Sequence, residues 1–216
     1  MSAVLALPLS VAEPDPRAVA ERRVKRSLIE TVHALAATIE LRDPYTAVHQ
    51  RRVADVAVGI GRQLGLTASQ LCGLDLAATI HDIGKLGVPA EILSKPGRIS
   101  ATEFELIKGH AAAGAEIVRG VDFPWPIRDI IWQHHERMDG SGYPRGLKGD
   151  EIVLEARILA VADVTEAMAS HRPYRRALGI DAALAEIESG RGKRYDANCV
   201  DACLKLFREL GHRLPG

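Results

Sequence analysis

The sequence predicts an all-α protein, built as a single bundle of helices with its functional groups in the core. Apolar residues recur at steps of three and four along most of the chain, and no segment shows the strict alternation of a half-buried strand. Hydrophobic residues make up 47% of the 216 residues but aromatic residues only 4%. Aliphatic side chains and alanine must therefore fill the core, which favours packed helices. A chain of this length suits one good-sized domain.

The first predicted helix covers residues 16–41. Its apolar residues follow the helical period: Val24, Leu28, Val32, Leu35 and Ile39. Before it, residues 1–15 contain an apolar stretch that Pro8 interrupts and that is too short to cross a bilayer, so we expect a disordered or loosely docked N-terminus. The basic run "RAVAERRVKR" is interpreted as a solvated face. The rest, residues 16–216, is expected to form one helical domain, with no nucleic-acid polymer and no membrane as partner.

Helix signals continue through the middle of the chain. Apolar residues at helical spacing predict a second helix, which Gly65 ends: Val53, Val56, Ile60 and Leu64. Thr67 with Gln70 forms a capping-box signature for the helix that carries "LCGLDLAATIHD". "SKPGR" predicts a turn, and Ser100 with Glu103 forms a second capping box before "FELIKGHAAAGAEIV", which is expected to be one helix.

The last third of the chain predicts four more helices. Pro124 and Pro126 precede one that ends at His134 and His135. "LEARILAVADVTEAMAS" contains a piece, "RILAVAD", that resembles a buried strand, but its length and its alanines favour a helix. Two further helices are expected at residues 180–188 and 196–210, the last ended by Gly211.

Charge and cysteine usage limit the partners and the compartment. Lysine plus arginine and aspartate plus glutamate both number 28, so any anionic ligand must be met by local positive charge. Cys72, Cys199 and Cys203 form an odd set without a secretory signal, which indicates reduced thiols in the cytoplasm. Cys199 and Cys203 lie at helical spacing, which favours core packing over metal binding.

Histidines and aspartates gather at the predicted helix ends and apolar faces. A single histidine on an apolar face is usually a satisfied core residue, but five share this placement: His49, His81, His110, His134 and His135. Asp82 follows His81, and Asp163 lies in an apolar stretch where an unpaired carboxylate is costly. Helix bundles build metal sites in this way. Nitrogen and oxygen donors without thiolate favour iron or manganese, with zinc also compatible. Seven donors suit two metals that share a carboxylate, an arrangement known for phosphoester hydrolysis.

The loop after the paired histidines, "ERMDGSGYP", carries Gly140 and Gly142. Glycine permits a sharp turn and close approach to the backbone. We therefore expect these glycines to turn the chain and to let a ligand approach.

These motifs, in this order, closely resemble the HD-GYP subgroup of the HD phosphohydrolase superfamily. The resemblance covers residues 40–206 and rests on "IELRDPYTAVHQRRV", "HDIGKLGVP", "KGHAAAG", "HHERMDGSGYPRGLKG", "ARILAVAD", "HRPYR" and "RYDANCVDA". It implies an HD-type helical bundle and a phosphodiesterase that uses hydroxide activated by two metals to cut cyclic di-GMP to pGpG, and in many members on to GMP. It also admits diguanylate cyclase-type or other signalling proteins as partners, and an oligomer.

The resemblance also implies roles for single residues. It makes seven residues the ligands of two divalent ions, iron or manganese, with Asp82 as the bridge: His49, His81, Asp82, His110, His134, His135 and Asp163. Lys85 would join Asp82 in catalysis, beside the scissile phosphate. Gly142, Tyr143 and Pro144 would form the loop that shapes the pocket, while Arg172 and Arg175 would contact the ligand.

The chain departs from the family pattern at a few positions. Thr165 and Glu166 replace an aromatic residue and an aspartate, His171 replaces an acidic residue, and "YDAN" replaces "FDP". Members with three metals carry a glutamate four residues before the first histidine, where this chain has Tyr45, so we expect two metals. Two alternatives stay open: a signalling module that binds cyclic di-GMP or a protein without hydrolysing, and an HD-type hydrolase of another nucleotide.

Overall fold

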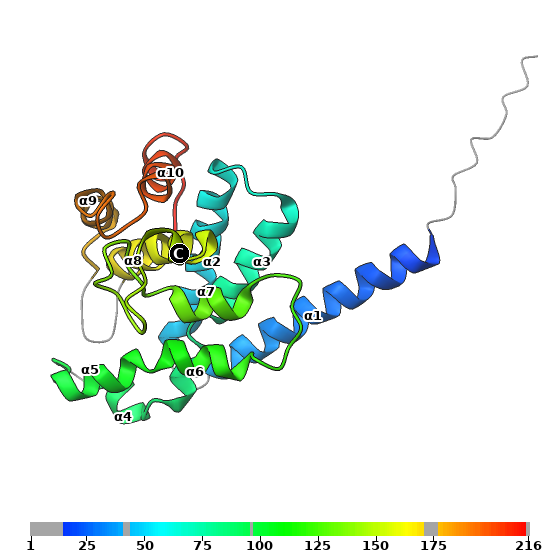
Figure 1. The fold of residues 1–216 in the computed structure, drawn as a ribbon, viewed down its shortest axis with the longest axis horizontal. Coiled ribbons are helices and arrows are strands. Elements are labelled where there is room, and N and C mark those ends of the chain that lie inside the picture. The colour runs from blue at the N-terminus through cyan, green and yellow to red at the C-terminus, as the bar shows by residue number, and fades with distance from the viewer. Residues whose placement is uncertain (1–14, 41–43, 96, 171–176, 215–216) are drawn as a thin grey trace, which may run out of the picture.

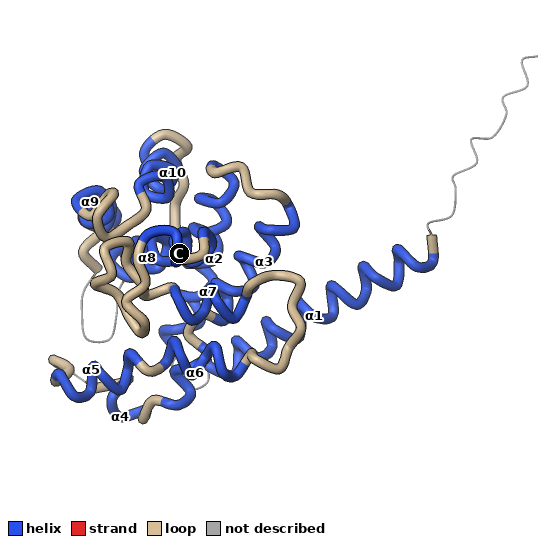
Figure 2. The backbone as a smooth tube through the Cα atoms, in the orientation of Figure 1, coloured by secondary structure: helices blue, strands red, loops and turns tan. Residues whose placement is uncertain are grey.

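The structure is a computed structural model that describes residues 15–40, 44–95, 97–170 and 177–214. Helices make up its regular elements (Figures 1 and 2): α1 (Pro16–Glu40), α2 (Pro44–Gln63), α3 (Ala68–Ile80), α4 (Ala90–Leu93), α5 (Ala101–Lys108), α6 (His110–Ile117), α7 (Ile127–Gln133), α8 (Leu154–Ala169), α9 (Ile180–Ser189) and α10 (Ala197–Arg208), with the 3₁₀ turns η1 (Ile83–Gly87) and η2 (Gly149–Glu151). The described part of the chain contains isolated bridges but no strand. The predicted all-α class is confirmed.

Helices α2 and α8 form the centre of the bundle. α2 packs on α3 and α8, α8 also contacts α7 and α9, and α10 closes against both α2 and α8. "RILAVAD" lies wholly in α8, where Ile158, Leu159 and Val161 are fully buried, so the helical interpretation of this stretch is confirmed. Cys199 and Cys203 are free and buried in the same core, as predicted.

Helix α1 packs on the bundle through its C-terminal part only. Val32 and Ala36 are buried, whereas Val24, two turns earlier, is 70% exposed. Figure 1 shows the N-terminal part of α1 extending away from the bundle. The predicted bounds of this helix agree with the structure to within a residue. The predicted N-terminal segment, residues 1–15, lies outside the described residues except for Asp15.

The predicted caps begin the helices where expected. Thr67 accepts the N–H of Gln70, Ser100 accepts the N–H of Glu103, and both capping boxes are complete. Gly65 and Gly211 have positive φ values of 77° and 66° just beyond α2 and α10. These local signals predict element boundaries because each depends on hydrogen bonds within a few residues.

One predicted helix is wrong. "FELIKGHAAAGAEIV" forms two helices, α5 and α6, which meet at Gly109. The Nδ1 atom of His110 lies 2.7 Å from the carbonyl oxygen of Ile107, which in an unbroken α-helix would accept the N–H of residue 111. The break gives His110 the first position of α6.

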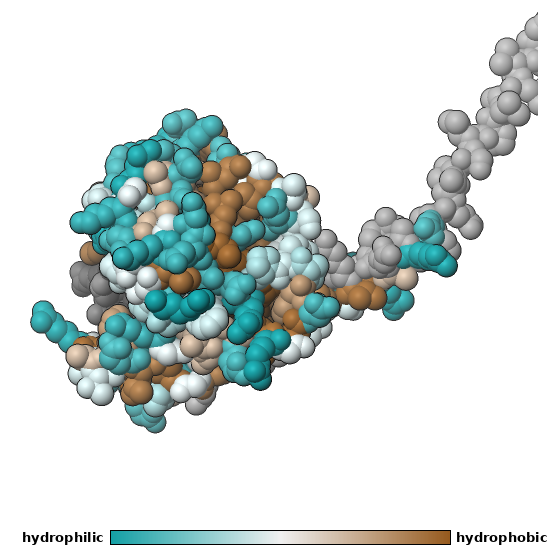
Figure 3. Space-filling model, in the orientation of Figure 1, coloured by the Kyte–Doolittle hydropathy of each residue, from teal (hydrophilic) through white to brown (hydrophobic). Residues whose placement is uncertain are grey.

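The surface is mixed. On the face shown in Figure 3, hydrophilic residues cover much of the bundle, and apolar residues reach the surface over the upper part of α2, between α10 and α3. Within the described ranges no helix has the length and apolar character needed to span a membrane.

Candidate metal centre

The predicted ligand residues come together in the core, although they lie on elements far apart in the chain. His49 lies in α2, His81 directly follows α3, His110 begins α6 and Asp163 lies in α8. His134 and His135 directly follow α7. All seven are buried except His135, which is partly buried: His49, His81, Asp82, His110, His134, His135 and Asp163.

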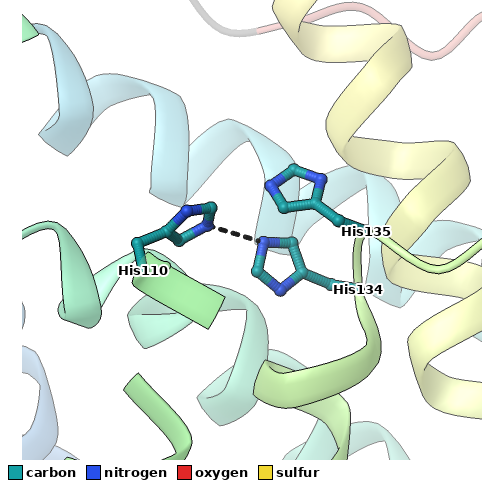
Figure 4. A group of neighbouring side chains, drawn as sticks. All are labelled: His110, His134 and His135. Carbon is teal, nitrogen blue, oxygen red and sulfur yellow. Dashed lines mark hydrogen bonds between the residues drawn. The ribbon is translucent and has the colours of Figure 1, made fainter. Parts of the chain in front are cut away.

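Donor atoms from these residues form overlapping groups, in each of which the atoms lie within 4.8 Å of one another. One group is His49, His81 and Asp163, and another is His110, His134 and His135. Figure 4 shows the second group, in which His110 faces the paired histidines and its Nε2 lies 3.3 Å from Nε2 of His134. Two imidazole nitrogens that face each other so closely point toward a common position.

Asp82 lies between the two groups. Its Oδ2 is 3.5 Å from Nε2 of His81, and its Oδ1 is 3.3 Å from Nε2 of His110. Each oxygen of the carboxylate therefore faces a different group. A carboxylate that bridges two ions needs this arrangement.

Helix ends orient three of the imidazoles. The Nδ1 atoms of His81, His110 and His134 lie 2.7, 2.7 and 2.6 Å from the carbonyl oxygens three residues earlier, on Ala78, Ile107 and Ile131. Those carbonyls belong to last helical turns, which leave acceptors without an intrahelical partner. A carbonyl only accepts, so Nδ1 carries the proton and Nε2 keeps its lone pair toward the cluster.

The adjacent histidines can face the same site because α7 ends directly before them. Its last helical residue is Gln133, and the chain turns at His134 and His135. The ring of Tyr143 then lies on the ring of His135, with centroids 4.7 Å apart. Positions 134 and 135 would diverge on a continuous helix.

The glycine-rich loop folds back on this turn. Gly140 has φ +80°, which confirms the predicted sharp turn. A Cβ on Gly142 would come within 2.4 Å of the backbone nitrogen of Arg137 and 2.5 Å of the carbonyl oxygen of His135. The close approach expected at Gly142 is made by the protein's own backbone. Glycine lets the loop lie flat against the histidines.

A buried carboxylate that the sequence analysis missed holds the same loop. Glu136 accepts the N–H of Arg145 at 2.7 Å and of Leu147 at 3.0 Å. The side chain is buried next to the paired histidines. Its position directly after them was the one available signal, because a charged residue so close to a buried cluster needs partners.

Electrostatics keep the donors in the forms that bind cations. Burial alone would raise the pKa of Asp82, but Lys85 and the surrounding imidazoles outweigh it and hold that pKa well below its usual range. Burial would likewise raise the pKa of Asp163, but His49 above all lowers it well below its usual range. Burial lowers the pKa of His110 and His135, and lowers that of His134 to about 3. At neutral pH the carboxylates are ionised and these imidazoles neutral.

Lys85 lies beside Asp82, with Nζ 2.6 Å from Oδ2 of the carboxylate. Glu166, which in the sequence is only a departure from the family pattern, also lies at this centre. It is 1% exposed and contacts Nδ1 of His49. Its place three residues after Asp163, on the same face of a helix, was a usable signal.

Some predicted residues lie outside the described part of the chain. Arg172, Arg175 and His171 fall in residues 171–176, and the side chain of Tyr45 is likewise not described.

The donor set fits divalent cations. It combines neutral imidazoles whose Nε2 atoms face inward with ionised carboxylates, and no thiolate lies in any of the groups. Such mixed nitrogen and oxygen sites suit iron, manganese or zinc.

Comparison with known proteins finds similarity over most of the chain. Residues 33–199 match a family model described as HD domain. The chain is 44% identical over 183 residues to the cyclic di-GMP phosphodiesterase response regulator RpfG of Xanthomonas campestris, covering 84% of this chain and 48% of that protein. It is 41% identical over 185 residues to a cyclic di-GMP phosphodiesterase of Thermotoga maritima, covering 85% and 50%. The chain thus spans about half the length of these curated relatives.

Among solved structures, a cyclic GMP-AMP specific phosphodiesterase of Vibrio cholerae, V-cGAP3, superposes with a TM-score of 0.54 at 34% identity. The match covers 82% of this chain and 40% of that one.

Proposed function

The chain belongs to the HD domain family, and we propose that it is a metal-dependent phosphodiesterase that hydrolyses cyclic di-GMP to pGpG. One observation carries the proposal: the inward-facing donors of two groups lie on either side of one carboxylate, with a lysine beside it. A purely structural cluster would have no reason to leave so many lone pairs facing one another in the core.

We assign the donors to two ions. His49, His81 and Asp163 would hold one, and His110, His134 and His135 the other. Asp82 would bind both, because its two oxygens face different groups. The chemistry that bound iron or manganese supplies at such a centre is activation of water near neutral pH and neutralisation of charge on the phosphoryl group.

Lys85 would hold the scissile phosphate. Its ammonium is beside Asp82, and its side chain is 16% exposed, so it can reach an anion that arrives from solvent. Cyclic di-GMP is an anion and the chain has no net charge. Capture therefore depends on local cations, and we assign Arg172 and Arg175 to that task alongside Lys85. The loop at Gly142, Tyr143 and Pro144 would form one wall of the pocket.

The similarity to V-cGAP3 supports a second candidate substrate. V-cGAP3, which is similar in sequence and fold, acts on a nucleotide that contains adenine as well as guanine. Both RpfG and the Thermotoga protein are named for cyclic di-GMP. We place cyclic di-GMP first, and 3′3′-cGAMP is the alternative substrate. A cytoplasmic location would give access to both and is consistent with the free cysteines.

The test is hydrolysis by purified protein loaded anaerobically with Fe²⁺ or Mn²⁺. Cyclic di-GMP, 3′3′-cGAMP and cyclic di-AMP are supplied separately, and products are separated by chromatography. We expect pGpG from cyclic di-GMP, at a higher kcat/KM than for the other two. Faster turnover of 3′3′-cGAMP would support the alternative substrate. Tight binding without product would support a signalling module, and absence of binding would overturn the cyclic dinucleotide assignment.

A further inference from the structure

His49 differs from the other histidines of the centre in where it lies on its helix. His81, His110 and His134 each directly follow a helical turn whose last carbonyls are free, and each gives its Nδ1 to one of them. His49 lies within α2, which continues for several turns beyond it. The carbonyls of its own turn are committed to the helix ladder. Its ring therefore needs an acceptor from elsewhere in the fold.

Glu166 of α8 supplies that acceptor. One of its oxygens, Oε2, contacts Nδ1 of His49 across 117 positions of sequence. On the other side of the ring, Nε2 of His49 lies 3.2 Å from Oδ1 of Asp163. Because Asp163 and Glu166 lie three residues apart on α8, one face of that helix contacts both ring nitrogens.

The carboxylate of Glu166 is itself held in place. Its second oxygen, Oε1, accepts the hydroxyl of Ser170 at 2.6 Å, and Nη1 of Arg52 lies 3.6 Å from the same oxygen. Arg52 also donates to Ser170 at 3.0 Å. A carboxylate buried in the core requires such partners. Arg52 lies on α2 with His49, so two contacts join the same pair of helices.

We propose that Glu166 is the positioning residue for His49: it holds the proton on Nδ1 and so presents the Nε2 lone pair to the centre. This inference deepens the proposed function, on which it rests, and assigns Glu166 no contact with substrate. A carboxylate behind a ligand histidine fixes the tautomer and ring orientation and raises the basicity of the ligand. Neutral carbonyls do this for His81, His110 and His134, so His49 differs from these three in having a carboxylate behind its ring.

Two variants and one control test the proposal. Glu166→Gln keeps the shape and an acceptor oxygen but removes the charge, and Glu166→Ala removes the acceptor. Thr165→Val is the matched control, since Thr165 is a buried neighbour whose hydroxyl bonds to Val161 and faces Cys203 instead of the centre. Circular dichroism establishes that each variant is folded.

The first measurement is the tautomer of His49 in metal-free protein, from the ¹⁵N signals of the histidine rings. We expect wild type and Thr165→Val to show Nδ1–H, and Glu166→Ala to show a mixture of both tautomers. An unchanged His49 signal in Glu166→Ala would overturn the proposal. This readout does not depend on metal loading or activity.

The second measurement is Mn²⁺ binding by calorimetry. Loss of a supporting partner costs about 10–100-fold in metal affinity. We expect about 10-fold weaker binding for Glu166→Gln and about 100-fold for Glu166→Ala, at one site only, while the site of His110, His134 and His135 is unchanged. Equal affinity in all variants would overturn the role of Glu166 and leave the proposed function standing. If wild type bound no Mn²⁺, the proposed function would fail, and the ring signals would still decide on Glu166.

Discussion

Asp82 is the residue on which both halves of the centre depend. Its carboxylate contacts His81, His110 and Lys85, and it is buried. Burial raises its pKa, and Lys85 is the strongest of the neighbours that lower it and keep the carboxylate ionised. Each of the other ligand residues serves one group in our assignment, so loss of Asp82 should have the widest effect.

We expect Asp82→Ala to reduce turnover of cyclic di-GMP by more than about 100-fold, because loss of a shared ligand should exceed the 10–100-fold cost of losing a supporting partner. The metal content per chain, measured by elemental mass spectrometry, should fall as well. Asp122→Asn, at an exposed carboxylate, is the control and should retain both. Near-normal turnover in a folded Asp82→Ala protein would contradict the assignment.

At the scale of elements, most histidines of the centre lie at the ends of helices. The 3₁₀ turn η1 follows Asp82 and packs on α6, which begins with His110. Gly84 makes this packing possible, because a Cβ there would lie 1.9 Å from the carbonyl oxygen of His110 and 2.5 Å from the nitrogen of Gly114. Both obstacles are backbone atoms, which cannot rotate away.

Gly84→Ala should therefore force η1 away from α6 and separate Asp82 from His110. We expect a loss of unfolding free energy of about 2–3 kcal/mol, in the upper range for overpacking, together with weaker Mn²⁺ binding. Gly87→Ala is the matched control in the same turn, since a Cβ there meets nothing within 4 Å. Urea denaturation and calorimetry measure the two effects. Equal stability of the two variants would argue against this packing constraint.

At the scale of the whole molecule, the fold keeps several imidazoles neutral in its core. Burial first, and then neighbouring histidines, lower the pKa of His134 to about 3, and burial also lowers the pKa of His110. In the unfolded chain these groups titrate near 6.5. Between these values the unfolded state binds more protons, so stability falls as pH falls.

We predict that metal-free protein loses unfolding free energy when the pH falls from about 6.5 to 5.5, by up to ~1.4 kcal/mol for each histidine that stays neutral. Above about pH 7.5 stability should be nearly independent of pH from this source. Urea denaturation in the presence of a chelator measures the profile. His134→Asn should reduce the loss of unfolding free energy by the contribution of one histidine. An unfolding free energy that stays constant or rises on acidification would disprove the prediction.

The metal count is also a property of the whole chain. Position 45, one turn before His49 in α2, is a tyrosine, and a phenol with a pKa of about 10 is a poor ligand at neutral pH. We expect close to two ions per chain in anaerobically prepared protein, by elemental analysis against protein concentration. A reproducible count of three, lost on changing a carboxylate near His49, would contradict the two-ion assignment.

Local signals in the sequence determined most of the fold. Helical periodicity, the capping boxes at Thr67 and Ser100, and the glycines beyond helix ends act within one or two turns, so they can be recognised without knowing the partner elements. The order of motifs also predicted the family, which the match over residues 33–199 confirms. Residue chemistry predicted the type of donor, because imidazole and carboxylate in apolar surroundings need a partner.

Only the tertiary structure decided how those groups meet. Asp82 faces two groups of histidines, Glu166 contacts the far side of the His49 ring, and Gly142 lies against the backbone of His135. These contacts depend on how separate elements pack together. The break at Gly109 belongs here too, since it places His110 at a helix start facing the cluster. Periodicity states which face of a helix is buried. It does not state which residue of another helix lies opposite. That depends on how the two helices cross, which cannot be read from the local sequence of either one.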